Sequence, residues 1–203
     1  MTPGKPQILT CPFCGAKKEI MTLASGNTFG AEFWSDNKQI APMLPEISLV
    51  QKCPKCGKYY IRTRQNVVYS EKGWCFEKGT LSFGEMKEAF HQLQEQGFED
   101  EKEEINIRMM LHHAYNDYYY RNDDTHIVNE EDRKLFHENG QWLIKNLITD
   151  NVMKAEFYRE IGEMEAAKSI LDSIHVEDDF LKNISDEIIR RISNNDDKVF
   201  RIQ

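Results

Sequence analysis

Apolar and polar positions follow two different patterns along the chain, and the change between them falls near residue 75. Before it, short runs rich in branched and aromatic residues alternate with turn residues, at 7–10, 28–34, 39–44, 48–51 and 59–63. Such runs are typical of β-strands. The two that flank 35–38 predict a hairpin, and Pro42 and Pro45 limit its second arm to an edge strand or an irregular run.

Beyond residue 75 the apolar residues recur three or four positions apart, as on the buried face of a helix. In the segment 100–121 this face consists of Ile107, Met110, Leu111, Ala114, Tyr115 and Tyr118. The same period predicts helices over 82–94, from 129 onward, over 151–161, 163–174 and 178–193, with a short tail after residue 194.

Four residues mark the predicted helices more closely. Ser82 with Glu85 has the spacing of a capping box, and Asn129 is an expected N-cap. Gly140 falls in the middle of the third helix, where glycine costs about 1 kcal/mol relative to alanine. We therefore expect a close helix crossing at Gly140.

These patterns predict an α+β chain with a β-rich domain at 1–75 and an all-α domain at 76–203. The two segments differ in charge. Residues 1–75 contain ten Lys/Arg and five Asp/Glu, a balance of +5, whereas residues 76–203 contain 16 and 29, a balance of −13. Opposite charge indicates different partners for the two segments, or contact between them.

The sequence shows no apolar run of 18 residues and no secretion signal at its start. We expect a cytoplasmic protein that has no membrane partner.

Two pentapeptides carry the clearest chemistry, Cys-Pro-Phe-Cys-Gly at 11–15 and Cys-Pro-Lys-Cys-Gly at 53–57. In a reducing compartment, such pairs more often hold metal than form disulfides. The predicted ligands are Cys11, Cys14, Cys53 and Cys56. Four thiolates suit Zn²⁺ and leave no open coordination position, so the predicted site is structural.

These eight Cys, Pro and Gly positions resemble the zinc-ribbon family, over residues 7–65. The resemblance implies Zn²⁺ clamped beneath a small antiparallel sheet. The knuckles also resemble those of rubredoxin, which would imply iron and electron transfer; zinc is the favoured interpretation because a rubredoxin-like module usually has a shorter spacer.

Basic and aromatic residues surround the second knuckle. As zinc ribbons often bind nucleic acid, this set supplies candidate phosphate contacts and a stacking surface, although a solvated face is the simpler interpretation. The set is Lys52, Lys55, Lys58, Tyr59, Tyr60, Arg62 and Arg64.

The segment 151–174 resembles one tetratricopeptide repeat, with Ala155, Tyr158, Gly162 and Ala167 at its small, aromatic, turn and small positions. The whole arrangement, a two-knuckle ribbon followed by a tetratricopeptide-like helical array, resembles a group of uncharacterised bacterial proteins. Arrays of this kind usually hold a protein or peptide.

Other features have simpler interpretations than a site. His112 and His113 lie near Asp117, and His113 and Asp117 share a helix face, but no second acidic or histidine pair has matching spacing, so helix-surface hydrogen bonding is the simpler interpretation. The tyrosines at 115–120 are expected in the core. Cys75 lacks a neighbouring thiol and is expected to be a buried structural residue. No phosphate loop, nucleophile elbow or His-Glu-x-x-His pair occurs.

We therefore expect a non-catalytic zinc-binding protein whose helical scaffold binds another protein. The alternatives are a nucleic-acid-associated factor using the basic ribbon and an iron electron carrier.

Overall fold

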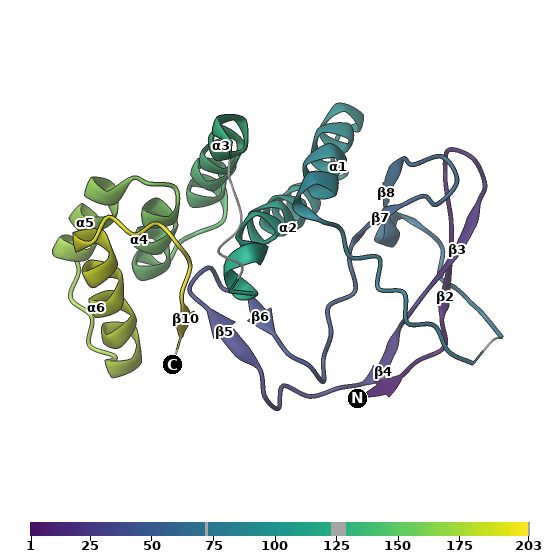
Figure 1. Ribbon diagram of the computed structural model, residues 1–203, viewed down its shortest axis with the longest axis horizontal. Coiled ribbons are helices and arrows are strands. Elements are labelled where there is room, and N and C mark those ends of the chain that lie inside the picture. The colour runs from purple at the N-terminus through teal and green to yellow at the C-terminus, as the bar shows by residue number, and fades with distance from the viewer. Residues whose placement is uncertain (72, 123–128, 203) are drawn as a thin grey trace. The chain divides into compact units, whose positions relative to one another are not determined.

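A computed structural model describes residues 1–71, 73–122 and 129–202. Its chain forms small antiparallel sheets followed by six α-helices in the described part, which confirms the predicted α+β class (Figure 1). It divides into two compact units. Unit 1 comprises Met1–Ala31 and Ile40–Ala114, and unit 2 comprises Glu32–Gln39 and Tyr115–Gln203. The sequence predicted a domain boundary after residue 75. Because that boundary concerns which segments fold independently, it stays a prediction.

Short antiparallel ladders make up the β part of unit 1. Strand β2 (Gln7–Thr10) pairs with β3 (Lys17–Ile20) and β9 (Val68–Tyr69), and β7 (Val50–Lys52) pairs with β8 (Tyr59–Ile61). The registers Thr10↔Lys17 and Lys52↔Tyr59 close two hairpins, so each cysteine knuckle is the turn of a hairpin. A further pair joins β1 (Thr2–Pro3) to β4 (Leu23–Ser25).

Helix α1 (Phe83–Gln96) also belongs to unit 1 and begins as predicted. The Ser82 side chain accepts a hydrogen bond from the Glu85 backbone, and the Glu85 side chain accepts one from the Ser82 backbone. This reciprocal pair satisfies two N–H groups at the helix start and confirms the capping box. The buried face of α1 includes Met86, Ala89 and Leu93.

The remaining helices are α2 (Glu101–Tyr120), α3 (Glu130–Asn146), α4 (Asn151–Glu160), α5 (Met164–Ser173) and α6 (Asp179–Ser193). Asn129 caps α3 as predicted, and Asp150 and Asp178 cap α4 and α6 by accepting from a backbone N–H three residues on. No helix in the described ranges combines the length and apolar character needed to cross a bilayer.

Small residues allow the helices of unit 2 to approach closely. Ala155 of α4 and Ala167 of α5 are fully buried in one cluster, against which Tyr158 packs. A methyl group added to Gly140 of α3 would lie 2.3 Å from the Cγ2 atom of Ile161. The close crossing expected at Gly140 is therefore present.

The hairpin predicted around 35–38 is also present, with β5 (Glu32–Trp34) and β6 (Gln39–Ile40) joined by a turn in which Asn37 has φ of 65°. The C-terminal segment, however, is more than the expected tail. Its strand β10 (Arg201–Ile202) pairs antiparallel with β5, and Ser35 and Phe200 exchange hydrogen bonds. This pairing secures the hairpin segment within unit 2.

Candidate metal centre

The two knuckles have the same backbone hydrogen bonds. In the first, Gly15 N–H donates to the Cys11 carbonyl and Cys11 N–H donates to the Ala16 carbonyl, at 2.9 and 2.8 Å. In the second, Gly57 and Cys53 repeat the pattern at 3.0 and 2.9 Å. The repeated sequence thus gives repeated local structure.

Each knuckle ends on a glycine in the left-handed region, with φ of 70° at Gly15 and 73° at Gly57. This conformation is accessible to glycine at little cost, and it turns the chain back into the second strand of the hairpin. Any other residue type there would strain the loop that carries two of the four sulfurs.

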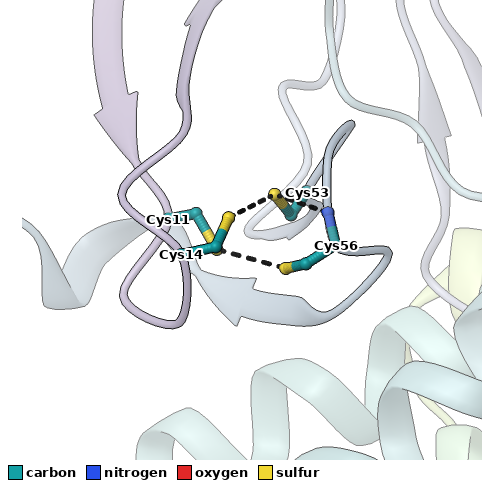
Figure 2. A group of neighbouring side chains, drawn as sticks. All are labelled: Cys11, Cys14, Cys53 and Cys56. Carbon is teal, nitrogen blue, oxygen red and sulfur yellow. Dashed lines mark hydrogen bonds between the residues drawn. The ribbon is translucent and has the colours of Figure 1, made fainter.

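The four cysteines converge on one point, as Figure 2 shows. Their sulfur atoms all lie within 4.8 Å of one another, with Cys11 Sγ 3.6 Å from Cys56 Sγ and Cys14 Sγ 3.6 Å from Cys53 Sγ. A tetrahedral ion with metal–sulfur bonds of about 2.3 Å needs sulfur–sulfur distances of about 3.8 Å. The arrangement therefore forms a candidate metal site with two ligands from each hairpin.

The backbone of the second knuckle favours a thiolate at Cys53. Burial opposes ionisation, but the N–H groups of Cys56 and Lys55, at 3.5 and 3.4 Å from Sγ, together with neighbouring thiols, lower the pKa of Cys53 to about 6. A metal requires the deprotonated ligand. The backbone N–H groups around Cys53 thus stabilise the charged form of the sulfur that a metal ion would bind.

Tyr60 packs into the apolar cluster beneath the knuckles, together with Leu9 and Ile20. Burial raises the pKa of Tyr60 to about 12, and the nearby cysteine charges add to the shift. Tyr60 is 3 % exposed and therefore serves the core of unit 1, although sequence placed it among candidate surface contacts.

Three further members of that basic and aromatic set contact acidic residues within unit 1. Lys52 Nζ lies 2.9 Å from the Glu85 carboxylate, and the Tyr59 hydroxyl donates to Glu88 at 2.7 Å. Arg64 forms an ion pair with Glu103. These contacts tie the second knuckle and the chain after β8 to the helices of the same unit.

The last three members are Lys55, Lys58 and Arg62. The Lys58 ammonium lies 4.8 Å from the centre of the Phe13 ring, which joins the two knuckles across the site. Arg62 donates to the Gln7 side chain at 3.3 Å. Among the described residues, Lys55 and Lys58 form no ion pair.

Three other sequence features have ordinary settings. Asp117 pairs with Arg121, and neither His113 nor Asp117 belongs to a metal-compatible group in the described ranges. His112 is fully buried, so its expected place on the helix surface is wrong. Tyr115 is buried and stacks on Phe136, as expected of a core residue. Cys75 is half-buried, and its thiol donates to the Glu19 carbonyl at 3.4 Å.

Unit 2 contains a buried polar cluster that sequence reasoning missed. Asn116 donates to Asp36 at 3.0 Å and to Glu160 at 3.1 Å, and the Tyr120 hydroxyl donates to Asp36. Burial raises the pKa of Glu160 well above its usual range, and the charges of Glu156 and Asp36 add to this effect. The sequence placed Asp36 in the turn of the predicted hairpin and gave no indication of these distant partners.

No family model, curated protein or solved structure matches this chain.

Proposed function

We propose that the chain is a non-catalytic scaffold in which a structural Zn²⁺ holds the two hairpins together and the helical region binds another protein. The observation that carries the first part is the convergence of four sulfurs from two equivalent hairpin turns. Four protein ligands fill a tetrahedral shell and leave no position for a substrate. An ion there would stabilise the fold without binding a substrate. The function would then depend on the surface of the folded protein.

Zinc is the metal that this donor set fits best. Thiolates are soft ligands that suit both zinc and iron, and a closed four-sulfur shell is the commonest structural zinc environment. Elemental analysis of protein purified under reducing conditions should give about one zinc per chain and a spectrum without visible absorption. An iron content near one, with the absorption of ferric thiolate, would instead establish the electron-carrier alternative.

The helical part supports the proposal of a protein partner. The pair α4 and α5 has the small buried residues and the turn glycine that a tetratricopeptide-like unit requires, with φ of 85° at Gly162. Helix α6 exposes two large apolar side chains, Phe180 and Ile189. Contiguous exposed apolar patches are typical of protein interfaces, whereas single exposed apolar side chains are common on any surface, so these two residues define the positions to test.

Affinity capture with the zinc-loaded full chain tests this role. A protein recovered by the native chain should rebind after purification and should be lost with Phe180→Asp or Ile189→Asp. Lys168→Asp, a substitution at an exposed position of α5 that also makes the surface more acidic, serves as the control and should retain it. Recovery of the same proteins by all four chains, or of none, would contradict the proposed role.

The basic ribbon is a second candidate surface, because Lys55 and Lys58 form no ion pair among the described residues. A nucleic-acid role would require salt-dependent binding, since each phosphate contact releases counterions. Titration of labelled oligothymidylate at several salt concentrations tests it. Submicromolar binding that Lys55→Glu weakens and Lys102→Glu, on α2, does not would establish this alternative.

A further inference from the structure

A pocket in unit 2 lies between one face of α6 and the C-terminal segment. It has a volume of about 780 Å³ and is bordered by Phe180, Ile184 and Arg191 on α6, by Lys198 on the C-terminal segment, and by Trp34 and Tyr119. Pockets of about 300 to 1,000 Å³ accommodate small organic ligands. The size of this pocket therefore permits a ligand of that class.

The charge of the pocket is opposite to that of the unit that contains it. The sequence of unit 2 has thirteen Lys/Arg and twenty-two Asp/Glu, whereas the pocket is bordered by four basic residues and one acidic residue. The acidic residue, Glu187, is held by Arg190 at 2.6 Å and by Arg191 at 2.8 Å. Its charge is thus already offset by the two guanidinium groups.

One of the basic residues has no acidic partner. Arg191 also pairs with Asp196 and Arg201 with Glu32, at 2.7 and 2.8 Å. The Lys198 ammonium, in contrast, contacts only the face of Tyr119 within the described ranges, 5.7 Å from the ring centre. An ammonium group over an aromatic ring remains able to bind an anion, because it has three donor positions.

A second hydrogen-bond donor at the pocket is also unsatisfied. Trp34 is 7 % exposed, and its indole N–H has no hydrogen-bond partner among the described residues. A buried donor without a partner costs about 1 to 3 kcal/mol, and each such group calls for an explanation. The nitrogen itself has almost no exposed surface, however, so Trp34 borders the pocket with its ring and does not present this donor to it.

Apolar side chains form another part of the border, which also contains Asn122 and Asn183. Phe180 is 55 % exposed at the pocket, and Ile184 lies one turn further along the same face of α6. A hydrated inorganic ion gains nothing from such residues, whereas a ligand with an aromatic or aliphatic body buries them. Donors and apolar side chains together define an amphipathic anion.

We propose that this pocket binds a small organic acid, with its anionic group at Lys198 and its apolar body against Phe180 and Ile184. The site is independent of the four-cysteine centre, and it shares Phe180 with the proposed protein-binding surface. It would make the helical unit a receptor for a metabolite of that chemical class.

Two matched fluorescent probes test the pocket in the zinc-loaded full chain. The anion is 8-anilinonaphthalene-1-sulfonate, and N-phenyl-1-naphthylamine is the same ring system without the sulfonate. The anion should bind saturably at one site. Lys198→Glu should weaken it about tenfold, because the reversal replaces attraction with repulsion at contact distance, and should change binding of the neutral probe less than twofold.

Lys182→Glu is the matched control, since Lys182 lies on α6 but does not border the pocket. It should leave binding of both probes unchanged, whereas Phe180→Ala should weaken both. Equal loss of the anionic probe with the two lysine variants, or an absence of saturable binding, would overturn the proposal.

Nuclear magnetic resonance gives a measurement that does not depend on a pocket variant. The chain has three tryptophans, and Trp74→Phe and Trp142→Phe assign the Trp34 indole resonance by elimination. The sulfonate probe and octanoate should each shift this indole resonance, because the Trp34 ring borders the pocket and a bound ligand changes its surroundings. Shifts confined to Trp74 and Trp142, or an unchanged Trp34 resonance, would place the anion elsewhere and refute the assignment.

Discussion

Replacing Gly140 with alanine tests the close crossing in unit 2, because two physical effects of opposite sign meet at this position. Alanine is the better helix former by about 1 kcal/mol. The added methyl group, however, would lie 2.3 Å from Ile161 Cγ2. Carbon atoms in contact are normally about 3.5 to 4.0 Å apart, so either the side chain or the helix must move.

The clash should prevail over the propensity. Overpacking a core costs about 1 to 3 kcal/mol, and the upper value applies here because Cγ2 is attached directly to Cβ and rotation of χ2 cannot move it. Subtracting about 1 kcal/mol of helix propensity leaves a net loss of about 2 kcal/mol. Gly140→Ala should therefore destabilise the chain.

A double-mutant cycle isolates the contact. Ile161→Ala removes Cγ2 and should destabilise by about 2 to 4 kcal/mol on its own. Gly140→Ala combined with it should be less destabilising than the sum of the two by about 3 kcal/mol, the full cost of the clash. Ile161→Val keeps a methyl group at this position, so it should give no such relief. Urea unfolding, with slopes compared among all variants, measures each free energy.

Two outcomes would refute the reasoning. If Gly140→Ala raises stability, helix propensity governs the position and the two segments are further apart than the structure places them. If the combined variant with Ile161→Ala is simply additive, the two sites are not in contact.

Three further predictions concern the metal and the polar contacts. Verified metal removal by a strong chelator should abolish the near-UV circular dichroism of Tyr60 and its neighbours, because structural zinc contributes apparent binding free energy of about 10 kcal/mol. Glu160→Gln should gain stability relative to the native chain as pH rises from 5 to 8, measured by urea titration. The Glu160 carboxyl ionises near pH 4.3 in the unfolded chain, whereas burial raises its pKa well above that value in the folded chain. The native chain therefore loses stability as pH rises from the unfolded pKa toward the folded pKa. Tyr59→Phe, which removes the hydroxyl that donates to Glu88, should lower the unfolding free energy by about 1 to 2 kcal/mol, whereas Tyr69→Phe, at an exposed tyrosine, should change it by less than about 0.5 kcal/mol.

Local features of the fold could be predicted because their causes are local. The capping residues Ser82 and Asn129 act within three residues of themselves, and the knuckle glycines Gly15 and Gly57 act through their own φ angles. Gly140 was informative for a related reason. A residue that weakens its own helix is retained where another segment comes close, so the sequence pointed to the crossing without identifying Ile161 as its partner.

Pairings between distant segments could not be predicted in the same way. The contact between Ser35 and Phe200 joins residues 165 positions apart, and two-residue strands such as β10 leave no alternating pattern to recognise. The burial of Asp36 also depends on distant residues, because its partners Asn116 and Tyr120 come from α2. A charged residue in a turn motif indicates exposure unless its distant partners are known.

The contacts of the basic and aromatic residues around the second knuckle could not be predicted either, because their partners lie on a distant helix. These contacts link the candidate metal centre to α1. Lys52 and Tyr59 lie in consecutive strands of one hairpin, and their side chains contact Glu85 and Glu88 of α1. An ion that fixes the turn between those strands therefore also fixes the register in which the hairpin meets α1. Loss of the metal should accordingly weaken the start of α1 as well as the two knuckles, because a two-stranded hairpin of three-residue strands is marginally stable by itself. With a metal bound, the four cysteines would stabilise an arrangement of strand and helix, and the surface of unit 1 would depend on the metal through that arrangement.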